Sequence, residues 1–120
     1  MKKEKIKMLK KIGYECPIIC DPSAVVSKKT AIQEGTFIGK GVIINADVYI
    51  GKMCIINTGA IVEHDCQVGD FSHIAVGVVL CGEVHIGRET LVGANATIIQ
   101  GRSVGNGCIV GAGEVIRKDV

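Results

Sequence analysis

Aliphatic residues recur at every sixth position through most of the chain. The series runs from Val26 to Ile116, and each of its sixteen consecutive positions holds Val, Ile or Leu without an insertion. The position two residues earlier is small in fourteen of the sixteen cases, the exceptions being Arg102 and Glu114. Because successive strand residues face opposite sides, this period places one aliphatic and one small residue of each hexad inside a parallel β-helix. The sequence therefore predicts an all-β fold of this type.

The repeat also sets the size and limits of the β-helix. Three hexads make one triangular coil, so the series gives about five coils, stacked at ~4.8 Å each. The position after the aliphatic residue is often Gly or Asn, and we expect these residues to take the positive φ of tight corners. Residues 23–120 are assigned to the β-helix and residues 1–22 to a short basic helix and linker. In that segment Ile6, Leu9 and Ile12 share one helical face, and a glycine follows as a stop.

The residue just before each aliphatic position points outward, and sorting these residues by coil separates three outer faces. The first face holds Val25, Ile43, Ile61, Val79, Thr97 and Val115. The second holds Phe37, Ile55, His73, Leu91 and Ile109, and the third holds Ala31, Tyr49, Gln67, His85 and Ser103. Two faces are therefore apolar and one is polar. Because two apolar faces form too large a patch to remain in water, and a threefold ring covers both, we expect a homotrimer.

The charge distribution argues against two classes of partner. The net charge is +2, but the first eleven residues hold six of the fourteen Lys and Arg residues, and acids outnumber bases in the remainder. With no basic face along the body, nucleic acid is not expected as a partner. No run of about 18 apolar residues occurs, and the charged start has no apolar core of a signal peptide. We expect no membrane partner and a cytoplasmic location.

The six cysteines do not form a metal or disulfide pattern. No Cys-x2-Cys pair occurs, and the closest two are Cys16 and Cys20, with three residues between them. Three of the six fall on the small inward positions of the repeat, namely Cys54, Cys66 and Cys108. We expect reduced, packed thiols and no bound metal.

Two histidines are the candidate chemical groups. His64 is expected at the corner between the strands carrying Ile61 and Gln67, with an acid on each side, whereas His73 lies in an apolar column. They are half a coil apart, so in one chain they point away from each other, and in a trimer His64 can approach His73 of the next subunit. A neutral imidazole is a natural general base near pH 7. The alternatives are a solvated corner histidine, as we expect for His85, and an interface histidine bonded to a backbone carbonyl.

The segments "INTGAIVEHDC" (Ile56–Cys66) and Val110–Ile116 resemble bacterial sugar acetyltransferases of the hexapeptide-repeat superfamily. The similarity is greatest to the sialic acid O-acetyltransferase and UDP-bacillosamine N-acetyltransferase group. Residues 13–27 resemble the join before the β-helix of that group, with Asp21 where a histidine is common. The resemblance covers roughly residues 13–120 and implies a left-handed winding, an exception to the usual crossover rule.

The resemblance also implies roles for individual residues. In the family, the residue matching His64 is the general base, and the acid matching Asp65 increases its basicity. The base takes a proton from a sugar amine or hydroxyl, which attacks the thioester of acetyl-CoA. The residue matching His73 contacts acetyl-CoA, and Asn57 matches a residue near the acceptor, a sugar or nucleotide-sugar such as a sialic acid or bacillosamine-type sugar. The positions that match the cofactor channel are Gly82, Ala94 and Ala112.

Two departures from the family keep other functions open. Family members begin with a nucleotide-sugar-binding domain, of which only residues 5–14 would remain, and they end with a further tail; we therefore expect a truncated enzyme. A non-catalytic trimeric scaffold is one alternative. A γ-type carbonic anhydrase is another, but it needs three zinc-binding histidines, two of them separated by four residues. Here eight residues separate His64 from His73, and eleven separate His73 from His85.

Overall fold

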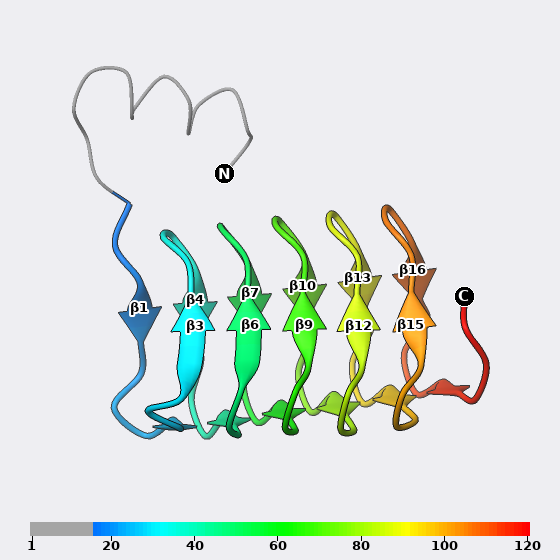
Figure 1. Cartoon of the computed structure of the whole chain (residues 1–120), viewed down its shortest axis with the longest axis horizontal. Coiled ribbons are helices and arrows are strands. Elements are labelled where there is room, and N and C mark those ends of the chain that lie inside the picture. The colour runs from blue at the N-terminus through cyan, green and yellow to red at the C-terminus, as the bar shows by residue number, and fades with distance from the viewer. Residues whose placement is uncertain (1–15) are drawn as a thin grey trace.

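The computed structural model describes residues 16–120, and in this range the chain winds into a coil of short parallel strands (Figure 1). Sheet A consists of β1 (Ile19–Cys20), β4 (Phe37–Ile38), β7 (Ile55–Ile56), β10 (His73–Ile74), β13 (Leu91–Val92) and β16 (Ile109–Val110). Sheet B consists of β2 (Val25–Val26), β5 (Ile43–Ile44), β8 (Ile61–Val62), β11 (Val79–Leu80), β14 (Thr97–Ile98) and β17 (Val115–Ile116). Sheet C consists of β3 (Thr30–Ile32), β6 (Val48–Ile50), β9 (Gln67–Val68), β12 (His85–Ile86) and β15 (Ser103–Val104).

The register of the sheets confirms the predicted repeat. Each strand pairs in parallel with its counterpart one coil later, so that His73 lies between Ile55 and Leu91 in sheet A. In Figure 1 the front strands run upward and the rear strands downward while the coils advance from the N- to the C-terminus, which is a left-handed winding. The all-β parallel β-helix of about five coils is thus confirmed.

The N-terminal boundary differs from the expectation. Strand β1 begins at Ile19 and pairs with β4, so the β-helix includes residues that were assigned to the linker. The pairing is possible because the chain already follows the 18-residue register there, with Ile19 beside Phe37. The short helix expected within residues 1–22 lies outside the described residues.

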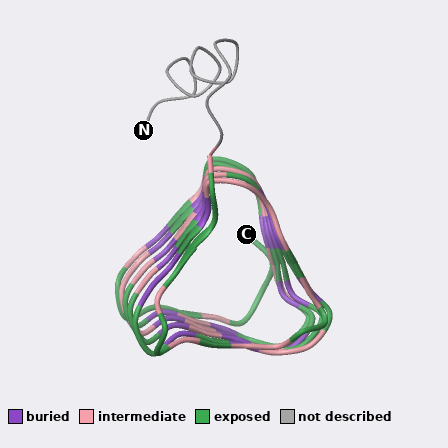
Figure 2. Cartoon of the chain, turned by 90° about the vertical axis from the view of Figure 1, so that its left-hand side faces the viewer, coloured by how far each residue is buried: buried purple, intermediate pink, exposed green. Residues whose placement is uncertain are grey.

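The interior of the triangular coil is filled by the two inward positions of the hexads, which are buried on all three sides in the central coils and only partly buried toward the two ends (Figure 2). Three buried polar residues, Thr36, Ser72 and Thr90, occupy small positions. The hydroxyl of Thr36 donates to the carbonyl of Gly51 at 2.7 Å and accepts from the backbone N–H of Cys54 at 3.1 Å. A small polar side chain therefore satisfies backbone groups of the corners, since a buried group left unbonded is costly.

The buried thiol of Cys66 also bonds to a backbone group of a corner. All six cysteines are free. The Cys66 thiol donates to the carbonyl of Cys81 at 3.1 Å, and burial raises the pKa of Cys66 to about 11. At neutral pH this thiol is protonated, so it acts as a core residue and hydrogen-bond donor rather than as a nucleophile.

The corner residues require a correction. Positive φ does not occur at the position after the aliphatic residue but two residues later, for example at Gly41 (φ 66°), Gly59 (φ 71°) and Asp65 (φ 61°). The glycines one position after the aliphatic residue are needed for another reason: a Cβ at Gly69 would lie 2.5 Å from the backbone nitrogen of Arg88. Close approach between neighbouring coils, not backbone handedness, selects glycine there.

Two outer faces remain apolar in the single chain. Phe37 and Ile109 of sheet A are 39% and 77% exposed, and Val25 and Val115 of sheet B are 66% and 44% exposed. The outer face of sheet C presents the expected polar column that includes His85. The faces are thus as the sequence predicted, and the homotrimer inferred from them stays a prediction.

Candidate active site

His64 stands on the turn between β8 of sheet B and β9 of sheet C, as the repeat predicted. Backbone hydrogen bonds fix this turn between its neighbours: the N–H of Asp65 donates to the carbonyl of Ala46 at 3.1 Å, and the N–H of Glu83 donates to the carbonyl of His64 at 2.9 Å. Asp65 has a left-handed φ of 61°. The stacked coils therefore hold the turn, and the imidazole of His64 projects from an ordered backbone.

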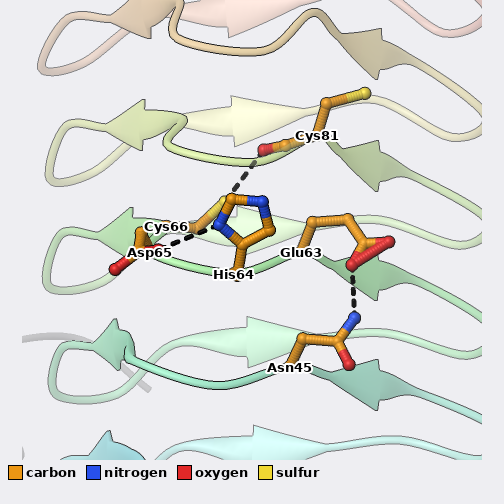
Figure 3. Close-up of polar contacts among 6 residues, drawn as sticks. All are labelled: Asn45, Glu63, His64, Asp65, Cys66 and Cys81. Carbon is orange, nitrogen blue, oxygen red and sulfur yellow. Dashed lines mark hydrogen bonds and ion pairs between the residues drawn. The ribbon is translucent and has the colours of Figure 1, made fainter.

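Asp65 binds the imidazole of His64. Its carboxylate oxygen Oδ2 lies 2.9 Å from Nδ1, and both side chains are about half exposed, at 53% and 54% (Figure 3). This hydrogen bond is the main cause of a raised pKa of His64; slight burial opposes it, and the charges of Asp65, Glu83 and Glu63 add to it. The carboxylate thus orients the ring through Nδ1 and makes the other nitrogen, Nε2, a stronger base.

The Nε2 side of His64 lies over Gly82, one coil further along the chain. A Cβ at Gly82 would be 2.6 Å from Nε2 and 2.8 Å from Cε1 of the ring. Any side chain at this position would therefore collide with the imidazole in its observed orientation. Glycine at this position therefore leaves room for the imidazole ring.

His73 belongs to a second group of candidate residues. Its Nε2 lies 3.4 Å from the amide nitrogen Nδ2 of Asn57, one coil below, and Oδ1 of Asn57 accepts from the backbone N–H of Thr58 at 2.8 Å. The partner of His73 is thus a side-chain amide, not the backbone carbonyl considered from the sequence. Ala94 and Ala112 lie on the turns that follow β13 and β16 at the same corner, between sheets A and B, as Asn57 does after β7.

The predicted site residues therefore form two groups. His64, Asp65 and Gly82 meet at the corner between sheets B and C, whereas Asn57, His73, Ala94 and Ala112 lie on sheet A and its corner with sheet B. One chain does not bring the two groups together. A cleft containing both needs a second copy of the chain.

Sequence reasoning missed one contact of the first group. The side-chain amide of Asn45 donates a hydrogen bond to the carboxylate of Glu63, the residue before His64 (Figure 3). Asn45 follows β5 and Glu63 follows β8, and the register of these strands places the two residues side by side. Their separation of 18 residues in the sequence was the signal that could have found the pair.

A concavity elsewhere on the surface does not coincide with these residues. It has a volume of about 270 Å³ and lies on the polar outer face of sheet C, beside Tyr49, Gln67 and His85. It is open and shallow, and none of the seven predicted site residues lines it. The hydrogen-bonded arrangement around His64 is better evidence for chemistry than this depression, because it combines an imidazole oriented through Nδ1 with a half-exposed side chain.

Residues 16–120 contain neither a cluster of metal ligands nor a membrane-spanning helix. No three His, Cys, Asp or Glu residues of this range are grouped closely enough to hold a metal ion. No helix there is long and apolar enough to cross a membrane.

Known proteins share both the repeat and the coil. Residues 83–118 match the family described as hexapeptide repeat of succinyl-transferase. The chain is 37% identical over 59 residues to the GDP-perosamine N-acetyltransferase of Escherichia coli O157:H7, in an alignment that covers 49% of this chain and 27% of that enzyme.

Solved structures match over nearly the whole chain. PerB from Caulobacter crescentus, in complex with CoA and GDP-perosamine, has a TM-score of 0.96 and 38% identity, and the match covers 98% of this chain and 57% of PerB. The acetyltransferase domain of PglB from Neisseria gonorrhoeae FA1090, in complex with acetyl coenzyme A, has a TM-score of 0.96 and 32% identity, covering 98% of this chain and 58% of that one. The chain spans little more than half the length of these solved relatives. Residues 83–118 therefore carry a hexapeptide repeat, and the chain is homologous to part of these sugar acetyltransferases.

Proposed function

We propose that this chain forms the catalytic β-helix of an acetyltransferase that moves an acetyl group from acetyl-CoA to a nucleotide-linked sugar. The observation that carries the proposal is His64, which Asp65 holds through Nδ1 and whose half-exposed ring packs against Gly82. This arrangement occurs in a domain homologous to enzymes solved with CoA, acetyl-CoA or GDP-perosamine. An amine is the favoured acceptor group because the named relatives include a GDP-perosamine N-acetyltransferase. Sialic acid and bacillosamine-type sugars belong to the same broad class of acceptor.

The residues around His64 fit a direct transfer. Acetyl-CoA supplies the acetyl group as a thioester, whose carbonyl carbon is electrophilic. Nε2 of His64 takes a proton from the acceptor nitrogen as that nitrogen bonds to the carbonyl carbon, and the bond from carbon to sulfur breaks. The proton then passes to the departing thiolate, which leaves as the thiol of CoA. Asp65 stabilises the positive charge that His64 carries in between.

The small residues of both groups fit the co-substrate. A Cβ at Gly82 would collide with the imidazole, so glycine lets the His64 ring keep its observed orientation. We assign His73, Gly82, Ala94 and Ala112 to the binding of acetyl-CoA and Asn57 to the acceptor side. Because these residues lie at two corners of one chain, we place the active site between subunits of a homotrimer, whose formation would also cover the apolar faces of sheets A and B.

A mixing experiment tests the shared site. His64→Ala and His73→Ala chains are each expected to have little activity with acetyl-CoA and GDP-perosamine. When equal amounts are mixed and allowed to exchange, about one cleft in four combines an intact His64 with an intact His73 of its neighbour. Activity should therefore rise to roughly a quarter of that of the unmutated protein.

The controls separate assembly from chemistry. His85→Ala, on the polar face of sheet C, should retain activity before and after mixing. Exchange of subunits is followed by mass spectrometry of isotope-labelled chains. If trimers exchange and no activity returns, the two histidines do not share a cleft; if the unmutated protein neither binds acetyl-CoA nor transfers acetyl, the proposed function is wrong.

A further inference from the structure

We propose that Glu63, held in place by Asn45, binds the acceptor nitrogen and selects an amine over a hydroxyl. The inference rests on the proposed function and adds to it a specificity determinant, Glu63, and a positioning residue, Asn45. It starts from the hydrogen bond that the Asn45 amide donates to the Glu63 carboxylate. Asp65 bonds to His64 instead.

The two acids next to His64 have different partners. Asp65 bonds to Nδ1 of the imidazole, whereas Glu63 bonds to Asn45 on the neighbouring coil. In Figure 3 the side chains of Glu63 and Asp65 lie on opposite sides of the His64 ring. Asp65 is therefore engaged with the base itself, and Glu63 flanks the side of the ring that Asp65 does not occupy.

The charge of Glu63 is not cancelled by its partner. The amide of Asn45 is neutral, and within residues 16–120 no Lys or Arg forms an ion pair with Glu63. Glu63 is only partly buried, and one hydrogen bond leaves a carboxylate with further lone pairs to accept others. The carboxylate is thus held in position and able to accept a hydrogen bond from a ligand beside the base.

An amino sugar matches this carboxylate better than a hydroxyl sugar does. Aliphatic amines are largely protonated at neutral pH, and hydrogen bonds between an ammonium and a carboxylate are roughly twice as strong as those between neutral groups. The carboxylate of Asp65 adds negative potential at the same corner. A hydroxyl acceptor gains none of this attraction, so the corner favours the amine.

The proton balance is compatible with a bound ammonium. The acceptor enters as R–NH3⁺ and ends as the amide R–NH–CO–CH3, so its nitrogen loses two protons. One goes to solvent before attack, and the other passes through Nε2 of His64 to the CoA thiolate as the bond from carbon to sulfur breaks. The overall change is R–NH3⁺ plus acetyl-CoA to the amide, CoA thiol and one free proton.

Asn45 acts through Glu63. Without the Asn45 amide, the Glu63 side chain would rotate among several orientations. Fixing one of them when the acceptor binds would then cost conformational entropy, which would weaken binding. Asn45→Ala should therefore weaken the binding of the amine in the same direction as removal of the Glu63 charge, but by less. Asn45→Ser, which restores a donor, should recover part of the loss.

The test compares a GDP-linked amino sugar, GDP-perosamine, with the same nucleotide sugar carrying a hydroxyl in place of the amine. The unmutated protein should favour the amine. Glu63→Gln should raise KM for the amine by about tenfold, because it replaces a charge-assisted bond by a neutral one, with little change in KM for the hydroxyl sugar. Glu83→Gln is the matched control, since it removes a neighbouring negative charge without touching the Asn45 contact, and its KM for the amine should change less than about twofold.

Each outcome decides a different point. Equal changes in KM for both acceptors, or an equal effect of Glu83→Gln, would overturn the selection by Glu63 while leaving the acetyltransferase function intact. Transfer to neither acceptor by the unmutated protein would overturn the function and the inference together. Retained acetyl-CoA binding and an unchanged thermal unfolding midpoint show that a variant is folded. If Asn45→Ala does not fold, the KM values of Glu63→Gln alone still test whether Glu63 selects the amine.

Discussion

His64 and His73 are close in the sequence but have contrasting surroundings. His64 stands half exposed on a turn, and a carboxylate holds its Nδ1. His73 is partly buried on strand β10, and the neutral amide of Asn57 is its partner. A carboxylate strengthens an imidazole as a base, whereas a neutral amide orients the ring without adding charge. The difference supports a division of work in which one histidine moves protons and the other contacts a ligand.

The two histidines also differ in their position relative to the expected contact between subunits. His73 lies in an apolar column between Ile55 and Leu91, on a face that we expect another subunit to cover. His64 lies at a corner, at the edge of the apolar face of sheet B. Joining the two therefore depends on the packing of subunits, and the strongest test of the comparison is to prevent that packing.

Ile61→Asp should have the largest effect. Ile61 lies in the middle of the outer face of sheet B, with Ile43 and Val79 on either side. A carboxylate buried there without a partner would cost several kcal/mol at each subunit contact. Light scattering should show a monomer, and acetyl transfer should be lost.

The matched control is Gln67→Asp on the polar face of sheet C, which should remain a trimer. A monomer of the unmutated protein at micromolar concentration would contradict the assembly. An active Ile61→Asp monomer would contradict the placement of the site between subunits.

Single substitutions of the two histidines separate their roles. His64→Ala should reduce kcat by 10² or more, the usual contribution of a general base, while acetyl-CoA binding measured by calorimetry is nearly unchanged. His73→Ala should instead weaken acetyl-CoA binding. If both variants lose binding and neither alters kcat on its own, the division of work is wrong.

Gly82→Ala should disturb His64 without removing it. The added Cβ would lie 2.6 Å from Nε2, so the imidazole must leave its observed orientation. We expect kcat to fall by roughly tenfold through misplacement of the base. Gly105→Ala is the control, since its Cβ would meet nothing closer than 3.4 Å, and its kcat should be unchanged. Equal losses in both variants would indicate a general effect of alanine in the coil.

The six-residue period predicted most of the fold because it runs without an insertion. Once 18 residues make a coil, each outward residue has a fixed column, which is why the neighbours of His73 were predicted correctly. The period does not say why a residue type recurs, so the glycines were explained by φ when close approach of the next coil was the cause at Gly69.

The candidate site was less predictable because it depends on side-chain orientation. The resemblance at Ile56–Cys66 pointed to His64 and Asp65, and the structure brings them together. The position of the imidazole over Gly82 and the bond from Asn45 to Glu63 needed three-dimensional coordinates. Both nevertheless join residues 18 apart, and a search of the sequence for polar pairs at that spacing would have suggested Asn45 and Glu63.

Asp65→Asn should have the smallest effect and gives the finest test of the contrast. The hydrogen bond to the Asp65 carboxylate is the main cause of the raised pKa of His64. Replacing this carboxylate by a neutral amide should therefore lower the pKa of His64. A base with a lower pKa becomes free of its proton at lower pH but is weaker once free. The acidic limb of the kcat/KM profile should therefore shift to lower pH, and the plateau at high pH should fall by a few-fold. Asp47→Asn, on the equivalent turn position one coil earlier, is the control and should leave the profile in place; an unshifted limb in Asp65→Asn would mean that another group sets the pH dependence.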